Sequence, residues 1–379
     1  MKGKQGLVCM GLLLVLSSCS CHTGKQITAS GLQRKDFQTE VNGQHTDLFT
    51  LSNKQGMEVC ITNYGARVVS ILVPDRNGKR EDVVCGFSTI TEYMEQRQNF
   101  GSTVGRYIGR ILNARFTLDG VEYKLVPNNG KSGHISHGGN PGFADRIWKV
   151  EQADTHRVRL SYLSPDGENG FPGNLKVTLV YSLGEDDNAL DLTYEATTDA
   201  PTVLNLSHHS FLNISGNFTK SVEDQQLWVD ADRFTPYDDK KCVTGEYLPV
   251  AGTPLDFRMP HTIGECIDAD HPQLKVVNGY DHTWELNTKG DDTRPAAWVY
   301  DPASGRKMEI FTTEPGMQIY TGNGLKGKMT GKGGIAYPFR SAVCFETMHF
   351  QDSPNQPGFP STVLRPGEVF RSHTVYKFE

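Results

Sequence analysis

The chain has 379 residues, with 38 Lys and Arg against 44 Asp and Glu, and its formal charge is −6 at neutral pH. This acidic balance argues against a nucleic-acid-binding protein, which typically carries a strongly basic surface. Aromatic residues make up 9% of the chain, more than a disordered protein carries, and 39 Gly and 19 Pro supply many turns. We therefore expect a folded, turn-rich protein that binds no nucleic acid.

The first residues of the chain are typical of an export signal. Lys2 and Lys4 precede an apolar run over residues 7–16, which small residues follow. A membrane-spanning helix needs about 20 apolar residues, so this run is too short to span a bilayer. A basic start, a short apolar core and small residues together describe a secretory signal.

The end of this signal, Leu16-Ser17-Ser18-Cys19, resembles the bacterial lipobox, in which the cysteine is lipidated and becomes the mature first residue. We predict a lipoprotein signal peptide over residues 1–18, lipidation at Cys19 and a polar tether over residues 19–36. The predicted location is the bacterial cell envelope, lipid-anchored and periplasmic or outer-membrane associated, with the lipid as the only membrane contact. The alternative is an ordinary secretory signal with a chance cysteine.

The cysteines do not indicate a metal or redox centre. The chain has eight, and the six that remain after Cys9 and Cys19 are set aside contain no C-x-x-C spacing. Zinc and thioredoxin-like chemistry both favour such spacing. Cys60 and Cys344 lie inside strand-like apolar runs, so we predict that they are buried free thiols.

Alternating apolar and polar residues recur along the chain, and this period of two predicts strands. One strand is expected over residues 157–162. Strand–turn–strand patterns follow over residues 175–194 and 297–312, and the C-terminal residues 369–378 alternate again. The single helical candidate covers residues 89–100, which could equally be a loop. The predicted fold class is therefore all-β, a large antiparallel sandwich, with residues 37–379 as one domain.

Two adjacent histidines, His208 and His209, lie within a strand-like segment. Neighbouring side chains on a strand point to opposite faces, so only one of them can face a given pocket. A zinc site built from both is therefore not expected. Taken alone, either histidine is more often a hydrogen-bonded structural residue than a catalyst.

One carboxylate, Glu346, interrupts an apolar run over residues 342–348. Burial of an ionised Glu is costly unless the group is paired or hydrogen-bonded. Desolvation raises the pKa of a carboxyl and makes it a better base. Glu346 is thus either a general base or the partner of a structural salt bridge.

Several short motifs give the chain a resemblance to a known family. The segment 205–211 (NLSHHSF) resembles the N-L-T-N-H-S-Y motif of aldose 1-epimerases, also called galactose mutarotases, and 344–347 (CFET) resembles their C-L-E-T motif. Six further segments match in the same order: 105–111, 136–139, 279–282, 315–323, 355–360 and 364–368. Eight ordered motifs cover nearly all of the chain after the tether.

The resemblance implies the mutarotase-type β supersandwich and an isomerase that interconverts the α and β anomers of free hexoses such as galactose and glucose. Carried over by position, the general acid falls on His209 and the general base on Glu346. The sugar-binding residues are implied to be Arg110, His137, Asp281 and Gln318. Without the resemblance, Arg110 and Asp281 would be interpreted as a structural ion pair.

The chain departs from the family motifs at two positions. His208 stands where the family usually has Asn, and Gly109 stands where many members have Asn before the sugar-binding Arg. Gly109 lacks a side chain that could contact the sugar, so this departure bears on the hydroxyl preference. The assignment of the acid to His209 rather than His208 rests on the register of the motif.

The residue types suit anomer interconversion, which needs one base at the C1 hydroxyl and one acid at the ring oxygen. No metal and no cofactor are expected, the substrate is a monosaccharide, and we expect a monomer. Two other hypotheses stay open: a non-catalytic carbohydrate-binding lipoprotein on the same fold, and a glycoside hydrolase. The first would need no proton-transferring pair, and the second normally uses two carboxylates.

Overall fold

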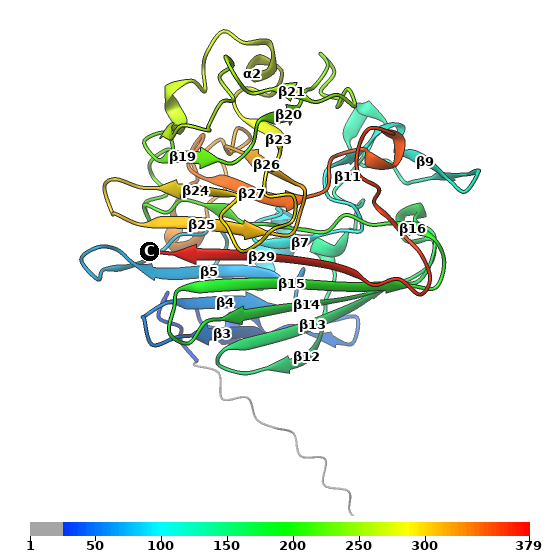
Figure 1. The fold of residues 1–379 in the computed structure, drawn as a ribbon. Helices are drawn as coiled ribbons and strands as arrows, with labels where there is room; N and C mark the ends of the chain where they lie inside the picture. Colours follow the sequence, from blue (N-terminus) through cyan, green and yellow to red (C-terminus); the bar gives the residue numbers. More distant parts are fainter. Residues whose placement is uncertain (1–25) are drawn as a thin grey trace, which may run out of the picture.

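The computed structural model describes residues 26–379, so the predicted signal peptide and Cys19 lie outside the described residues. Antiparallel strands dominate this part of the chain (Figure 1). The largest sheet has nine strands, in the order β12 (Lys149–Ala153), β13 (Arg157–Ser164), β14 (Leu175–Leu183), β15 (Ala189–Thr198), β29 (Phe370–Phe378), β25 (Lys307–Thr312), β24 (Ala297–Tyr300), β19 (Gln226–Val229) and β22 (His261–Thr262).

Two smaller sheets complete the main architecture. A six-stranded sheet has the order β18 (Phe211–Leu212), β27 (Val343–Met348), β26 (Gly316–Tyr320), β23 (Asp281–Glu285), β20 (Arg233–Thr235) and β21 (Leu248–Pro249). A four-stranded sheet consists of β3 (Leu48–Ser52), β4 (Glu58–Thr62), β5 (Arg67–Pro74) and β6 (Arg80–Asp82).

Short elements join these sheets. The two-stranded ribbons are β1 (Glu40–Val41) with β2 (Gln44–His45), β9 (Arg115–Leu118) with β10 (Val121–Lys124), β8 (Arg110–Ile111) with β11 (Ile135–Ser136), β16 (Thr202–Val203) with β28 (Val363–Leu364), and β7 (Ser102–Val104) with β17 (Ser207–His209). The α-helices of the described chain are α1 (Ile90–Gln96) and α2 (Pro272–Val277). The 3-10 turns are Arg34–Phe37, Leu112–Ala114, Gly130–Ser132, Phe143–Asp145, Glu168–Gly170, Ile263–Glu265, Lys332–Gly334 and Ser353–Asn355.

The nine-stranded sheet forms one layer, and the two smaller sheets pack behind it (Figure 1). One continuous apolar core contains side chains from all three sheets, such as Ile61 of β4, Leu179 of β14 and Trp284 of β23. Alternate residues of β14 point into this core, as the period-two pattern predicts. The all-β sandwich and the two predicted hairpins, β14–β15 and β24–β25, are confirmed.

The helical candidate over residues 89–100 forms α1, which is shorter than predicted. Thr89 Oγ1 accepts a hydrogen bond from the Glu92 backbone N–H, and the Glu92 carboxylate accepts one from the Thr89 N–H. This reciprocal capping box satisfies two backbone donors at the start of the helix. The helix ends at Arg97, which has a left-handed φ of 48°. None of the helices in residues 26–379 has the length and apolar character that crossing a membrane requires.

Residues 27–36, which the sequence places in the tether, pack against the four-stranded sheet. Leu32 is buried in an apolar cluster with Phe37 and Leu48. The backbone N–H groups of Ala29 and Ser30 donate to the Glu58 carboxylate of β4. Five cysteines lie in the described residues and all are free thiols. Cys60 and Cys344 are both buried, as predicted.

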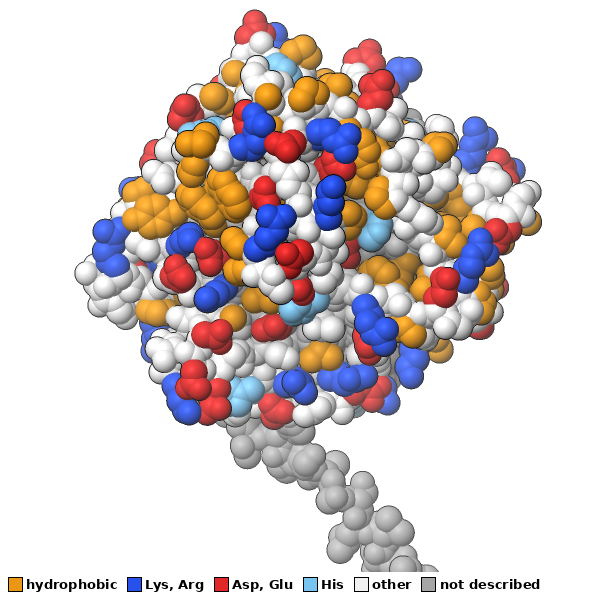
Figure 2. Space-filling model, viewed as in Figure 1, with side chains coloured by type: hydrophobic (Ala, Val, Ile, Leu, Met, Phe, Trp, Pro, Cys, Tyr) orange, Lys and Arg blue, Asp and Glu red, His pale blue; other side chains and the backbone are white. Residues whose placement is uncertain are grey.

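The surface carries charges of both signs. Figure 2 shows Lys and Arg side chains interspersed with Asp and Glu over the face that it presents. On that face the two signs of charge lie close to one another, and the absence of a nucleic-acid partner stays a prediction.

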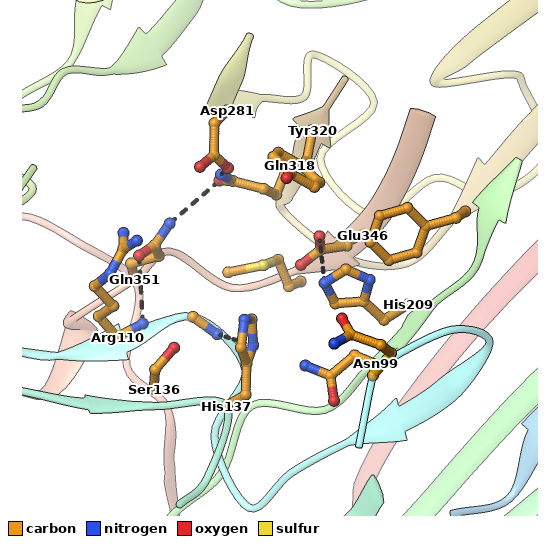
Figure 3. Close-up of a pocket in the computed structure, with 14 residues that line it drawn as sticks. Asn99, Arg110, Ser136, His137, His209, Asp281, Gln318, Tyr320, Glu346 and Gln351 are labelled. Atoms are coloured by element: carbon orange, nitrogen blue, oxygen red, sulfur yellow. Dashed lines mark hydrogen bonds and ion pairs between the residues drawn. The ribbon is translucent and has the colours of Figure 1, made fainter. Parts of the chain in front are cut away.

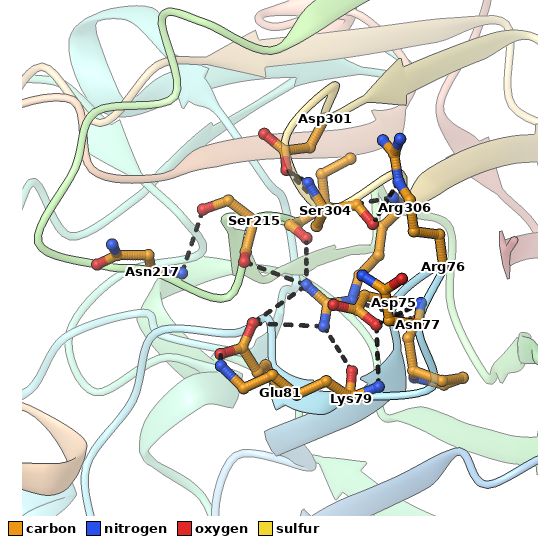
Figure 4. A network of polar contacts seen from close by, with 12 residues as sticks. Asp75, Arg76, Asn77, Lys79, Glu81, Ser215, Asn217, Asp301, Ser304 and Arg306 are labelled. Atoms are coloured by element: carbon orange, nitrogen blue, oxygen red, sulfur yellow. Dashed lines mark hydrogen bonds and ion pairs between the residues drawn. The ribbon is translucent and has the colours of Figure 1, made fainter.

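Arg306, the residue before β25, bonds to the β5–β6 hairpin and to the segment that follows β18 (Figure 4). The Arg306 side chain is fully buried. Its guanidinium lies 3.0–3.4 Å from the backbone oxygens of Pro74, Lys79, Ile214 and Ser215 and the carboxylate of Glu81. The planar fork of five donors lets one side chain satisfy all these acceptors.

We expect Arg306→Leu to lower the free energy of unfolding by at least about 3 kcal/mol, because several buried carbonyls lose their donor. Denaturation by urea, followed by circular dichroism, measures this loss. Arg76→Leu is the matched control, because Arg76 belongs to the same network but is exposed. We expect the control to change stability by less than about 1 kcal/mol. Equal stability of wild type and Arg306→Leu would contradict the prediction.

Candidate active site

The six-stranded sheet supplies one wall of the site through the alternation of its strands. On β27, Val343 and Phe345 point into the main core, so Glu346 points to the opposite face. On the neighbouring β26, Gln318 lies directly opposite Glu346 in the ladder. Both side chains therefore project from adjacent strands toward the same cavity.

The other predicted residues come from segments far away in the sequence. Asp281 begins β23 and pairs with Tyr320 in the ladder. Arg110 lies on β8, directly opposite Ser136 of β11, and His137 follows that strand. The six residues predicted for catalysis and sugar binding all line one cavity of about 250 Å³, together with Gln98, Asn99, Gly109, Ser136, Phe211, Tyr320, Met348 and Gln351.

The cavity is small and polar. Pockets for drug-sized ligands typically measure about 300–1,000 Å³, so this one fits a small molecule. Figure 3 shows the carboxylates, amides and imidazoles of the site converging on the same space. Such a lining suits a ligand covered with hydroxyl groups.

The predicted acid and base touch each other. His209 Nε2 lies 3.3 Å from Glu346 Oε1, and both side chains are less than one-tenth exposed (Figure 3). The His209 ring stacks on Phe211 at 5.1 Å between centroids and meets the His137 ring edge-on at 5.5 Å. These ring contacts restrict the orientation of the imidazole and aim Nε2 at the carboxylate.

Burial governs the pKa values of these groups. Desolvation raises the pKa of Glu346 well above its ordinary value, the Asp281 carboxylate raises it further, and Arg110 opposes the rise. Burial lowers the pKa of His209 to about 4. Burial also lowers the pKa of His137 to about 3, with added repulsion from His209 and Arg110. Each shift disfavours the charged form of the group.

The adjacent histidine faces away from the cavity. His208 Nε2 lies 2.7 Å from Ser210 Oγ, and its Nδ1 lies 3.4 Å from Tyr181 Oη of the large sheet. Burial lowers its pKa to about 3. The opposite orientation of the two histidines follows from strand alternation, as the sequence predicts, and it brings only His209 to Glu346.

Both the nitrogen and the oxygen of the Gln318 carboxamide are hydrogen-bonded to protein groups. Its Nε2 donates to Asp281 Oδ1 at 2.6 Å and reaches Tyr237 Oη at 3.4 Å. Its Oε1 accepts from Thr283 Oγ1 at 2.5 Å. Within residues 26–379 the Asp281 carboxylate bonds to this amide and forms no ion pair with Arg110, so the structural ion-pair alternative is not what the structure shows.

One set of side chains in the site has the spacing of metal ligands. His209, Cys344 and Glu346 each offer one donor atom, and these atoms lie within 4.8 Å of one another. Metals bind the cysteine thiolate, but burial and Glu346 raise the pKa of the Cys344 thiol well above its ordinary value. The protonated thiol is a poor ligand, and the absence of a metal from the reaction stays a prediction.

Sequence reasoning missed three residues that organise the site: Tyr237, Thr283 and Gln351. Tyr237 Oη accepts a hydrogen bond from Gln351 Nε2 at 2.7 Å, and burial together with Asp281 raises the pKa of Tyr237 to about 12. None of the three lies in a segment with a chemical motif of its own. Only the folded structure, which brings Thr283 of β23 together with Tyr237 and Gln351 from outside the named strands, reveals their contacts.

Comparisons with known proteins agree with this geometry. The sequence profile of the family described as aldose 1-epimerase matches residues 47–377. A galactose mutarotase of Sus scrofa is 38% identical over 330 residues, which cover 87% of this chain and 93% of that protein. An aldose 1-epimerase of Escherichia coli is 36% identical and covers 89% of this chain and 96% of that protein.

The chain belongs to the aldose 1-epimerase family. Among solved structures, the aldose epimerase homologue from C. elegans superposes with a TM-score of 0.81 at 31% identity, covering 88% of this chain and 99% of that one. A galactose 1-epimerase from Lactobacillus acidophilus gives a TM-score of 0.78 at 28% identity, covering 90% and 97%. The predicted family and fold are thus confirmed.

Membership of the aldose 1-epimerase family makes the chain an isomerase, as predicted. The two other hypotheses, a non-catalytic carbohydrate-binding lipoprotein and a glycoside hydrolase, gain no support from these relatives. The roles of the individual residues are not decided by family membership. They rest on the geometry of the pocket.

Proposed function

We propose that this aldose 1-epimerase interconverts the α and β anomers of free hexoses such as galactose and glucose, with Glu346 as general base and His209 as general acid. The observation that carries the proposal is the 3.3 Å contact between His209 Nε2 and Glu346 Oε1 in a small buried cavity. The C1 hydroxyl and the ring oxygen of a pyranose are bonded to the same carbon. A base and an acid that touch each other can therefore reach both oxygens.

The reaction moves one proton in each direction. Glu346 removes the proton from the C1 hydroxyl while His209 delivers its proton to the ring oxygen. The C1–O5 bond breaks, and an open-chain aldehyde forms. Rotation about C1–C2 presents the other face of the aldehyde. The hydroxyl at C5 then returns its proton to His209, Glu346 protonates the carbonyl oxygen, and the ring closes as the other anomer.

The pair needs a single proton for this cycle. Burial favours the uncharged forms of both groups, so the proton lies on Glu346 and the His209 imidazole is neutral. Transfer of this proton from Glu346 to His209 across the 3.3 Å contact produces a carboxylate and an imidazolium. The pair as a whole holds the same number of protons before and after the transfer. The two states belong to the pair rather than to either residue.

This proton count predicts a bell-shaped pH profile for kcat/KM. Below about pH 4, the lowered pKa of His209, a second proton binds and no base is left. At high pH, above the raised pKa of Glu346, the single proton is lost and no acid is left. Stopped-flow polarimetry across the pH range checks the profile. An acid limb near pH 6.5, the ordinary histidine value, would contradict it.

Polarimetry also tests the proposed function directly. Freshly dissolved α-galactose or α-glucose should reach its equilibrium rotation much faster with the protein than without it, and a chromogenic glycoside should stay intact. Rotation at the uncatalysed rate for both sugars would refute the proposal. Release of the chromophore would instead indicate a hydrolase, which normally relies on two carboxylates.

We also propose that the enzyme is anchored in the bacterial cell envelope by lipid on Cys19. The lipobox-like sequence over residues 16–19 supports this location. A single acyl chain gives marginal, reversible attachment, whereas a diacylglyceryl group supplies two chains on one cysteine. In this proposal the lipid on Cys19 is the membrane contact of the protein. Its partner in the reaction is a monosaccharide.

We expect Cys19→Ser to block lipidation, so that the protein no longer fractionates with the membranes. Its mutarotase activity should be unchanged. Fractionation followed by mass spectrometry of the N-terminal peptide checks the prediction. Cys21→Ser is the matched control, because Cys21 lacks the apolar residue three positions before it. Wild-type protein free in the periplasm, without lipid, would indicate a plain signal peptide.

A further inference from the structure

The position of Gly109, where many family members have Asn, is not an empty space in this protein. Gly109 has a φ of +76°, and a Cβ built on it would lie 2.6 Å from Cγ and 3.1 Å from Cδ of Gln351. The 2.6 Å contact is shorter than real Cβ atoms show, so a side chain at position 109 would have to displace Gln351. The Gln351 side chain, from a loop more than 200 residues further along the chain, therefore fills the place of a residue-109 side chain.

Gln351 is also bonded to the groups that line the cavity. Its Nε2 donates to Tyr237 Oη at 2.7 Å and to Gln318 Oε1 at 3.3 Å. Its Oε1 accepts from the Arg110 backbone N–H at 3.3 Å. Figure 3 shows Gln351 between Arg110 and Gln318, two of the residues implied to bind sugar.

The hydrogen-bonding capacity of this carboxamide leaves one site for a ligand. Both Nε2 hydrogens are used by protein groups, whereas a carbonyl oxygen has two lone pairs and only one is used. Gln351 is 4% exposed and lines the cavity. A buried acceptor in a site built for hydroxyl groups gains a hydrogen bond when a hydroxyl reaches it.

We propose that Gln351 is a substrate-positioning residue that determines hydroxyl specificity and takes over the sugar contact that a side chain at position 109 would make. Its Oε1 accepts a hydrogen bond from a sugar hydroxyl, while its Nε2 holds Tyr237 and Gln318 in place. The inference rests on the proposed mutarotase function. The activity of the wild type tests that function, and variants at positions 109 and 351 test this inference.

The first experiment replaces Gln351 with Met, which keeps the length of the side chain and removes its polar atoms. We expect KM for galactose to rise about three- to tenfold with kcat nearly unchanged. This is the effect of losing one hydrogen bond that is equally strong in the bound substrate and in the transition state. Galactose and its 2-, 3-, 4- and 6-deoxy derivatives identify the contact. The KM penalty for one deoxy sugar, present in the wild type, should disappear in Gln351→Met.

The second experiment adds a side chain at position 109 and shortens the one at position 351. Asn tolerates positive φ better than other residues with a side chain, so Gly109→Asn is feasible for the backbone. Gly109→Asn alone should raise KM, because its Cβ displaces Gln351. The double variant Gly109→Asn with Gln351→Ala should bring KM back to within about threefold of the wild type, whereas Gln351→Ala alone should not.

Thermal melting of each variant separates misfolding from lost binding, since folded variants melt within a few degrees of the wild type. In an active wild type, an unchanged KM in Gln351→Met, or the same deoxy-sugar penalties in both proteins, would overturn the inference. A double variant no better than Gln351→Ala alone would also overturn it. An inactive wild type would refute the proposed function instead.

Discussion

Glu346→Gln should slow mutarotation at least about 10²-fold while galactose binding largely survives, because the amide keeps the size of the carboxylate but cannot accept the C1 proton. The 3.3 Å contact with His209 Nε2 can persist, since an amide N–H can donate to Nε2 in place of the protonated carboxyl. Polarimetry measures the rate and calorimetric titration measures the affinity. If the affinity is retained while the rate falls, the substitution has removed the catalytic base and has not damaged the sugar-binding pocket.

Glu314→Gln is the matched control for this experiment. Glu314 is also a buried carboxylate, 2% exposed, and it lies 2.8 Å from His349 Nδ1, outside the cavity lining. The control should mutarotate within about threefold of the wild type. A near-normal rate in Glu346→Gln would remove Glu346 from the mechanism, and equal loss in both variants would indicate a general effect of replacing a buried carboxyl group.

His209→Asn should abolish most activity, by about 10²–10⁴-fold, because the ring oxygen of the sugar loses its proton donor. His208→Asn restores the residue usual in the family and should keep the rate within a few-fold of the wild type. It loses a hydrogen bond to Ser210 and one to Tyr181, so we expect a stability loss of about 1–2 kcal/mol. Polarimetry and thermal melting of the two variants check both statements.

The two histidine variants control each other, since both replace a buried imidazole on the same strand with the same residue. Activity lost in His208→Asn and retained in His209→Asn would place the acid at His208. That result would contradict the geometry, because only His209 lies against Glu346. Loss of both activities together with lower melting temperatures would indicate damage to the strand.

The sequence alone predicts the fold class, because the evidence for strands is local. Burial on one face of a sheet imposes a period of two, and residues 175–194 show that period on both sides of a tight turn. The same alternation is enough to assign His208 and His209 to opposite faces of their strand. The ordered motifs point to the family for a related reason, since each motif keeps its residues in one short segment.

The arrangement of the site is decided by tertiary structure. Arg110, His209, Asp281 and Glu346 belong to four strands, and only the pairing of those strands with their neighbours brings the side chains to one cavity. The raised pKa of Glu346 likewise depends on layers that cover both faces of β27. The continuous apolar run around Glu346 predicts burial, but long-range strand pairing and the identity of the groups that surround the carboxylate leave no mark on the local sequence pattern.

Gly109 shows the difference most clearly. From the sequence, the glycine is a missing side chain and a lost sugar contact. In the folded protein, Gln351 fills that space and bonds to Arg110 and Gln318. The sequence by itself thus determines the strands, the family and the chemical types of the site residues, because these depend on local periodicity and short motifs. Tertiary structure decides which side chains meet and which protons they hold, because contact and desolvation depend on segments hundreds of residues apart.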